Sequence, residues 1–144
     1  MMKEAIVLDT NCLIQILPEK SCYHRVWTDF LAGRYWLCVT NDILEEYEEI
    51  LCRFTTQRIA ENVIDAITHS RHTIRKETYY HYNLINADPD DNKFVDCALA
   101  ANAKYIVTND AHFNILKTMP FPKIEIISLK DFAAIHYQQG NTDM

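Results

Sequence analysis

Apolar and polar residues follow two different patterns along this chain. In the first pattern, short continuous apolar runs are bounded by polar residues, which is typical of strands buried on both faces of a parallel sheet. The runs predicted as strands are 5–8, 35–39, 105–107 and 124–127. The aromatic stretch 78–85 is predicted to be a further strand or a strand-like connection.

The second pattern places apolar residues three or four positions apart, which predicts helices. A short helix over 12–17 ends at Pro18, and Gly33 ends a helix over 22–31. The other predicted helices are 42–54, 56–69, 92–102 and 128–136, with a helical turn at 113–117. Strands that alternate with helices predict an α/β fold, a three-layer α/β/α arrangement with a mostly parallel central sheet.

The length of 144 residues and the composition fit one globular domain. Hydrophobic residues make up 49% of the chain and charged residues 24%, which argues against disorder. We expect a single domain over 1–137 and a frayed polar tail over 138–144. No apolar run reaches the roughly 18–20 residues that span a bilayer, and Lys3 and Glu4 lead into the first strand without a signal peptide. We therefore expect a cytoplasmic protein with no membrane contact.

The five cysteines and the net charge of −6 narrow the possible functions. The cysteines are odd in number, widely spread and without a C-x-x-C pair, which argues against a disulfide framework or a zinc knuckle. We expect most of them to be reduced and buried. A negative net charge is unusual for a nucleic-acid-binding protein. Divalent ions bound to carboxylates would reverse the local field, so the charge does not exclude nucleic acid.

Several carboxylates are expected at one edge of the sheet. Asp9 follows the first strand, Asp110 follows the strand over 105–107, and Asp88, Asp90 and Asp91 precede the helix beside that strand. Ligands bind at the carboxyl ends of strands in open α/β sheets. Asp91 taken alone is explained by a helix N-cap. Three acids in one loop favour a site instead, because like charges repel unless a cation gathers them.

The helix over 42–54 offers one more acid. On a helical wheel its apolar stripe faces the core, and Glu45 and Glu49 point the opposite way. Glu46 and Glu48 flank the stripe, and Glu46 lies nearer the N-terminal turn and therefore nearer Asp9. This position selects Glu46.

Such a cluster suits a hard divalent cation. Magnesium prefers oxygen ligands and is often held by one or two carboxylates together with substrate phosphates. A pair of such ions about 3.5–4 Å apart can drive the in-line displacement of a phosphoryl group. Nearby polar side chains could orient the ligands or bind a phosphate, namely Thr10, Asn11, Thr108 and Asn109.

Five short motifs occur in an order that is familiar from a known family. They are Val7-Leu8-Asp9-Thr10-Asn11, Thr40-Asn41-Asp42-Ile43-Leu44-Glu45-Glu46-Tyr47, Asp88-Pro89-Asp90-Asp91-Asn92-Lys93-Phe94, Ala98-Leu99-Ala100 and Tyr105-Ile106-Val107-Thr108-Asn109-Asp110. Each is weak alone, but together they cover nearly the whole chain. With these motifs in this order, the chain resembles the PIN-domain family of ribonucleases, and within that family the bacterial toxins of type II toxin–antitoxin pairs.

The resemblance implies roles for particular residues and partners. The family's four acids fall on Asp9, Glu46, Asp91 and Asp110, and Asn11 and Thr108 match its polar helpers. For the third acid, Asp88 and Asp90 are the alternatives. The resemblance implies that these acids hold Mg²⁺ or Mn²⁺ in an endonuclease that cleaves RNA. It also implies a homodimer and a cognate antitoxin partner.

Other interpretations of the same residues are weaker. A phosphatase of the haloacid-dehalogenase type would need a second Asp where this chain has Asn11, and a receiver domain would need an early acidic pair and a late lysine. The remaining alternative is a catalytically inactive module of the PIN fold that acts through RNA or protein binding. The presence of all four acids favours the enzyme.

Three further signals remain open in the sequence. The basic run 71–76 could steer an RNA backbone, although such runs are usually solvated. Tyr79, Tyr80 and Tyr82 could stack on bases, although aromatic residues at alternating strand positions are more often in the core. His112 could contact a substrate from its place just after Asp110.

Overall fold

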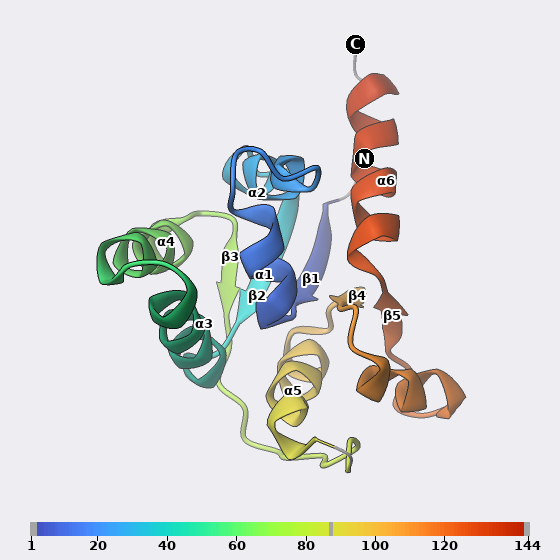
Figure 1. Cartoon of the computed structure of the whole chain (residues 1–144). Helices are drawn as coiled ribbons and strands as arrows, with labels where there is room; N and C mark the ends of the chain where they lie inside the picture. Colours follow the sequence, from blue (N-terminus) through green and yellow to red (C-terminus); the bar gives the residue numbers. More distant parts are fainter. Residues whose placement is uncertain (1–2, 87, 143–144) are drawn as a thin grey trace.

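The apolar runs form a five-stranded parallel sheet in the order β3-β2-β1-β4-β5 (Figure 1). This computed structural model describes residues 3–86 and 88–142. The strands are β1 (Glu4–Leu8), β2 (Tyr35–Val39), β3 (Thr73–Arg75), β4 (Tyr105–Val107) and β5 (Glu125–Ile127). All four strand pairings are parallel, so the prediction of a mostly parallel sheet is confirmed.

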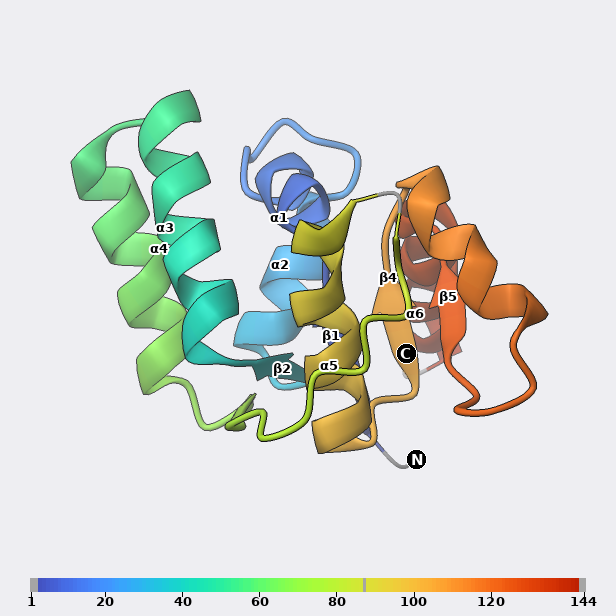
Figure 2. The same cartoon turned by 90° about the horizontal axis from the view of Figure 1, so that it is seen from below.

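Helices cover both faces of this sheet, which confirms the three-layer arrangement (Figure 2). The α-helices are α1 (Thr10–Ile16), α2 (His24–Leu31), α3 (Asn41–Phe54), α4 (Gln57–His69), α5 (Asn92–Ala101) and α6 (Leu129–Thr142). Two 3-10 helices are η1 (Pro89–Asp91) and η2 (Ala111–Thr118). α1, α2 and α6 lie on one face, α5 packs against β1, β2 and β4, and the α3–α4 pair extends beyond the β3 edge.

Of the two alternatives predicted for residues 78–85, the structure has the connection and not the strand, which lies earlier, at Thr73–Arg75. Residues 76–86 form an irregular connection; Lys76 still bonds to β2 through its N–H, and further along the backbone is bound by polar side chains of α5. Asp96 accepts a hydrogen bond from the backbone N–H of Tyr82 at 3.1 Å. The Asn92 amide bonds both the N–H and the carbonyl of Ile85, each at 2.9 Å.

The predicted end of the last helix near residue 136 is also too early. The backbone of α6 stays helical to Thr142, so most of the predicted polar tail is helical. Residues 143 and 144 of that tail lie outside the described residues. The helical turn predicted over 113–117 is present as the 3-10 helix η2.

The core contains three of the cysteines and the central strands. Cys12, Cys38 and Cys97 are buried free thiols, as expected, whereas Cys22 and Cys52 are exposed. Ile6, Val7 and Leu8 of β1 are almost completely inaccessible, and the apolar faces of the helices pack against both sides of the sheet. Among the described residues, no helix is long and apolar enough to cross a bilayer.

The register of the two central strands positions the acidic residues. Leu8 of β1 pairs with Val107 of β4, so the chain leaves both strands at the same level. Asp9 then bonds back to the sheet through its N–H, which donates to the Val107 carbonyl at 3.0 Å. The residues that follow the two strands therefore meet at one edge, as the apolar runs predicted.

Candidate active site

Asp9 lies at the centre of this edge and is held by β4. The residue is 6% exposed, and its Oδ2 accepts a hydrogen bond from the Thr108 hydroxyl at 2.8 Å. Burial is the largest influence on the carboxyl and raises its pKa, whereas the Thr108 hydrogen bond lowers it. Asp110 and Glu46 raise the pKa further through charge repulsion. The site thus concentrates negative charge in a poorly solvated place.

Glu46 reaches the same edge from α3. Thr40 caps that helix by accepting a hydrogen bond from the Ile43 N–H at 3.2 Å, which fixes the first turns beside the sheet. Glu46 is half-buried and accepts a hydrogen bond from the Thr10 hydroxyl, whereas Glu45 is exposed. The structure thus brings Glu46 to Asp9 and leaves Glu45 in solvent.

Asp91 is the acid whose negative charge is least balanced by hydrogen bonds. It ends η1 at the start of α5, yet its side chain makes no capping hydrogen bond within the described part of the chain, so the N-cap explanation is wrong. Its Oδ2 is buried and accepts no hydrogen bond from a described residue. Burial, followed by repulsion from Asp110, Asp88 and Asp9, raises the pKa of Asp91 to about 7.

Asp110 is held by the loop that follows β4. Its backbone N–H donates to the Thr108 hydroxyl oxygen at 3.0 Å, so one threonine bonds two of the acidic residues. Its Oδ1 caps η2 by accepting the His112 N–H at 2.9 Å. The His112 ring lies between two acids, with Nδ1 at 3.4 Å from Asp110 and 3.6 Å from Asp91.

The remaining predicted site residues are two threonines and two asparagines. Thr10 and Thr108 contact the acids directly, and Asn11 lines a pocket of about 400 Å³ together with Asp9 and Asp110. Asn109 lines the same pocket, but its Oδ1 is bound to the first N–H of α6 at 3.1 Å. Its role here is to position α6.

The two alternative loop acids differ from one another. Asp88 caps η1 through Oδ1, which accepts the Asp90 N–H at 3.1 Å, and it offers a ligand atom within 4.8 Å of those of Asp91 and His112. Asp90 is exposed and lies in a hollow beside Lys93. The structure therefore groups Asp88 with the site and separates Asp90 from it.

Three residues near the site were either not predicted from the sequence or given little weight. Lys93 donates to Glu46 Oε1 at 2.8 Å, His112 contacts two acids, and Phe54 lines the pocket of Asp9 while 69% exposed. The place of His112, two residues after Asp110, was the only local signal. Lys93 and Phe54 depend on how α3 docks beside α5 and α1, which a local pattern does not encode.

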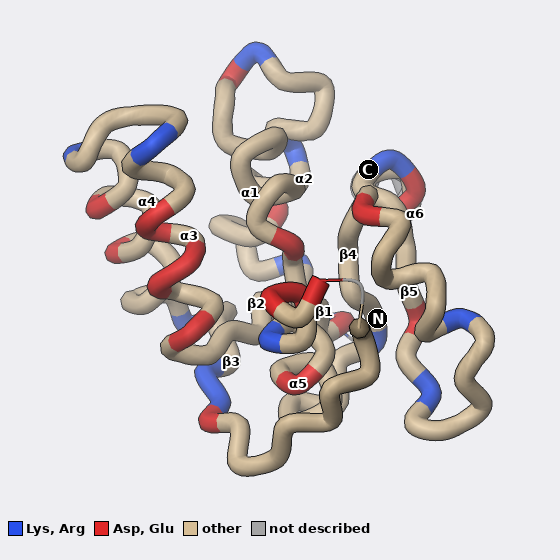
Figure 3. The backbone as a smooth tube through the Cα atoms, turned by 60° about the horizontal axis from the view of Figure 1, so that its bottom comes forward, with Lys and Arg blue, Asp and Glu red and all other residues tan. Residues whose placement is uncertain are grey.

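The chemistry of these side chains fits a divalent cation. Carboxylates from β1, α3, η1 and the loop after β4 converge, and Figure 3 shows acidic stretches gathered where β1 ends. A buried Asp91 oxygen that accepts no hydrogen bond from a described residue, and the mutual repulsion of the acids, are features that an oxygen-preferring cation would relieve. The donor set suits Mg²⁺ or Mn²⁺.

Comparison with known proteins agrees with this architecture. The family model described as PIN domain matches residues 5–112. No curated protein matches the sequence. Among solved structures, a chain of VapBC2 from Rickettsia felis, bound to a DNA fragment from its promoter, is 16% identical with a TM-score of 0.60; the match covers 86% of this chain and 98% of that one.

Two further structures have the same fold at similarly low identity. DNA-bound VapBC from Salmonella typhimurium is 20% identical with a TM-score of 0.56, over 90% of this chain and 99% of that one. The PIN domain endonuclease Utp24 is 19% identical with a TM-score of 0.51, over 86% and 84%. The PIN domain model matches most of the chain, and the fold and the acidic edge of the sheet agree with that match. The chain belongs to the PIN domain family.

Proposed function

We propose that this protein is a divalent-metal-dependent endoribonuclease that hydrolyses RNA phosphodiester bonds. The observation that carries the proposal is the convergence of Asp9, Glu46, Asp91 and Asp110 at one sheet edge, with a buried Asp91 oxygen left without a hydrogen bond. Repulsion among these acids destabilises the folded state, so their convergence does not serve the stability of the fold. A bound cation would neutralise this repulsion, so we infer that the cluster is a metal site.

These four acids would hold Mg²⁺ or Mn²⁺, which activates water and stabilises charge at the scissile phosphorus when bound. The chain's own contribution is positioning. Thr108 orients Asp9, and Thr10 and Lys93 orient Glu46. In metal sites, hydrogen bonds from surrounding residues to the ligands fix the orientation of those ligands in this way.

A covalent intermediate is not part of this proposal. Cys12 is a thiol close to Asp9, and burial raises its pKa to about 12. Because the thiolate is the nucleophilic form of cysteine, the Cys12 side chain is inert at neutral pH. Direct hydrolysis by water therefore suits the site.

The biological context that we propose is a toxin of a toxin–antitoxin pair, a homodimer in the cytoplasm with a cognate antitoxin. The sequence motifs resemble such toxins, and the fold is similar to chains of VapBC and FitAB structures. A basic segment of an antitoxin would suit the acidic cleft. The alternative, an inactive PIN-fold module that acts through RNA or protein binding, would be expected to have lost one of the four acids.

The test is cleavage of a mixed RNA pool by purified protein with Mg²⁺ or Mn²⁺. We expect cleavage that disappears with EDTA and in Asp9→Asn, which removes one charge but keeps an oxygen to accept the Thr108 hydrogen bond. Asp65→Asn, the same change at an exposed position of α4, should cleave normally. Undiminished cleavage by folded Asp9→Asn would exclude the proposed role of Asp9. An absence of cleavage by wild-type protein with either metal, across varied RNAs, would favour the binding module.

A further inference from the structure

The connection between β3 and α5 exposes a group of tyrosines. Tyr79, Tyr80 and Tyr82 are 80%, 74% and 47% exposed, whereas Tyr35 and Tyr47 are completely buried. Of the two interpretations of these tyrosines, burial in the core is therefore wrong. They lie on neighbouring residues of one segment, so they form a surface of aromatic rings.

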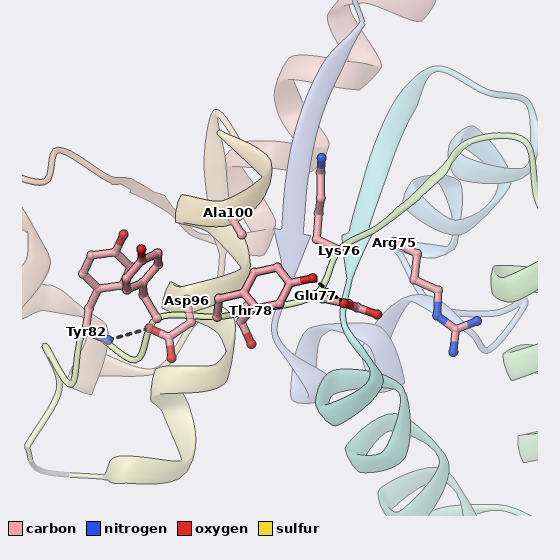
Figure 4. A pocket seen from close by; sticks show the side chains of 9 residues that line it. Arg75, Lys76, Glu77, Thr78, Tyr82, Asp96 and Ala100 are labelled. Carbon is pink, nitrogen blue, oxygen red and sulfur yellow. Dashed lines mark hydrogen bonds between the residues drawn. The ribbon is translucent and has the colours of Figure 1, made fainter.

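This surface is held by α5. Asp96 is only 4% exposed, and it accepts the Tyr82 N–H at 3.1 Å (Figure 4). Its Oδ2 also lies 3.2 Å from Nδ1 of His81. The backbone of the connection is thus anchored while its rings remain in solvent. A pocket of about 470 Å³ opens beside it, lined by Arg75, Lys76, Glu77, Thr78, Tyr79, Tyr80, Tyr82, Asp96 and Ala100.

The pocket adjoins a second hollow that includes a neighbour of the acidic site. This hollow of about 160 Å³ shares Thr78 and Asp96 with the pocket and extends to Lys93. Lys93 in turn donates to Glu46 at 2.8 Å. Thr78, Asp96 and Lys93 therefore lie between the tyrosines and Glu46.

Two cationic side chains, Arg75 and Lys76, line the first pocket together with Glu77. Arg75 is the last residue of β3 and Lys76 follows it, at the sheet edge where Asp9 lies; Figure 3 shows this basic stretch at the end of β3. Arg75 is oriented by Asn41 Oδ1, which accepts from its Nε at 3.1 Å. The predicted basic run 71–76 is thus divided, because Arg71 precedes β3 and lies at the opposite end of the strand.

We propose that this surface, the tyrosines 79, 80 and 82 with Arg75, Lys76 and Lys93, binds single-stranded RNA and leads it to the acidic site. The proposal names the form of the substrate of the proposed ribonuclease and rests on that function. Aromatic rings stack on unpaired bases of any sequence, and cations follow the phosphate backbone. A duplex keeps its bases stacked on one another and offers no base face to these tyrosines.

The experiment measures binding of a labelled single-stranded RNA of about 12 nucleotides, comparable to the roughly 4–16 nucleotides covered by single-strand-binding grooves. Asp9→Asn protein is used so that the RNA remains intact. The test variant changes Tyr79, Tyr80 and Tyr82 to Ala, and the matched variant changes them to Phe, which keeps the rings. Phe121→Ala removes an aromatic ring that is 88% exposed elsewhere and serves as the surface control.

We expect the Ala variant to bind the single strand at least about tenfold more weakly, because stacking on one ring alone contributes about fivefold or more. The Phe variant and Phe121→Ala should bind as the parent does, and the same RNA annealed to its complement should discriminate little between variants. Undiminished single-strand binding by the folded Ala variant would overturn the inference. An equal loss for duplex would also overturn it, because it would indicate electrostatic binding only.

Failure of the inference can be separated from failure of the proposed function. Hydrolysis of bis-p-nitrophenyl phosphate, which is too small to reach the tyrosines, reports on the acidic site alone. We expect the Ala variant made in otherwise wild-type protein to hydrolyse it at the wild-type rate with Mn²⁺. If RNA binding is unchanged while the variant loses a protein partner, the surface is a protein-docking site and the inference is wrong.

Discussion

Replacement of Asp91 by Asn should stabilise the metal-free protein at neutral pH. The Asp91 carboxyl has a pKa of about 7 in the folded state against an ordinary value of 3.8. A raised carboxyl pKa means that the unfolded chain releases this proton more readily than the folded one. The folded state therefore loses stability as pH rises from about 4 to about 7, and the loss is complete above pH 7.

The size of the effect follows from that difference. About three pH units at roughly 1.4 kcal/mol each give an upper bound of about 4 kcal/mol, and solvent screening at the rim of the site reduces it to about 2 kcal/mol. Loss of a negative charge at the start of α5 costs about 0.3–1 kcal/mol. The net gain of about 1–2 kcal/mol corresponds to a rise in Tm of about 3–7 °C for a domain of this size.

Thermal unfolding with EDTA at pH 8 and at pH 4.5 measures this gain. Asp91→Asn should melt higher than wild type at pH 8, and the difference should shrink at pH 4.5, where the folded wild type already carries the proton. Asp90→Asn is the matched control, because it makes the same change at the adjacent exposed residue. Saturating Mg²⁺ should raise the Tm of the wild type and of Asp90→Asn but not that of Asp91→Asn.

A lower Tm for Asp91→Asn than for Asp90→Asn at pH 8 with EDTA would refute this reasoning. It would mean that the Asp91 carboxylate stabilises the start of α5 as a cap, despite its lack of a capping hydrogen bond. An equal Mg²⁺ response in all three proteins would show that Asp91 is not a metal ligand.

Other consequences of the structure can be measured with single substitutions. Glu46→Gln should lower metal-dependent RNA cleavage at least about tenfold, whereas Glu45→Gln, the same change on the exposed side of α3, should leave it intact. Asp96→Ala should lower the urea-derived free energy of unfolding by about 1–3 kcal/mol, because a buried acceptor of the connection is lost. Tyr47→Phe should cost about 1–3 kcal/mol in the same assay, because the buried hydroxyl donates at 2.5 Å to the last carbonyl of β1. A loss below about 0.5 kcal/mol for either buried residue would contradict these assignments.

The sheet and most helices were predictable because their signals are local. The runs 5–8 and 105–107 are continuous and apolar, and the acid that follows each run marks the carboxyl edge without knowledge of the rest of the fold. The choice of Glu46 over Glu45 also needed only the period of one helix. Such local patterns place residues on an edge or a face.

The misplaced third strand had a non-local cause. Residues 78–85 have the aromatic composition of a strand, but buried polar groups of α5 bind their backbone and leave the rings exposed. The strand instead falls on Thr73–Arg75, a three-residue edge strand too short to give a distinct apolar run. Pairing between Lys93 and Glu46 likewise depends on how two helices dock, which the spacing of 47 residues does not reveal.

The charge distribution explains how a protein of net charge −6 can suit an anionic substrate. The acids gather where β1 and β4 end, and their repulsion is what a divalent cation relieves. Arg75 and Lys76 lie on the same edge, where β3 ends. A phosphate backbone would meet these cations before it reaches the candidate metal site. The affinity for RNA should therefore fall as the salt concentration rises, because salt screens the basic residues. Cleavage depends instead on the acidic residues. Net charge, which sums the two regions, hides this division along a single edge.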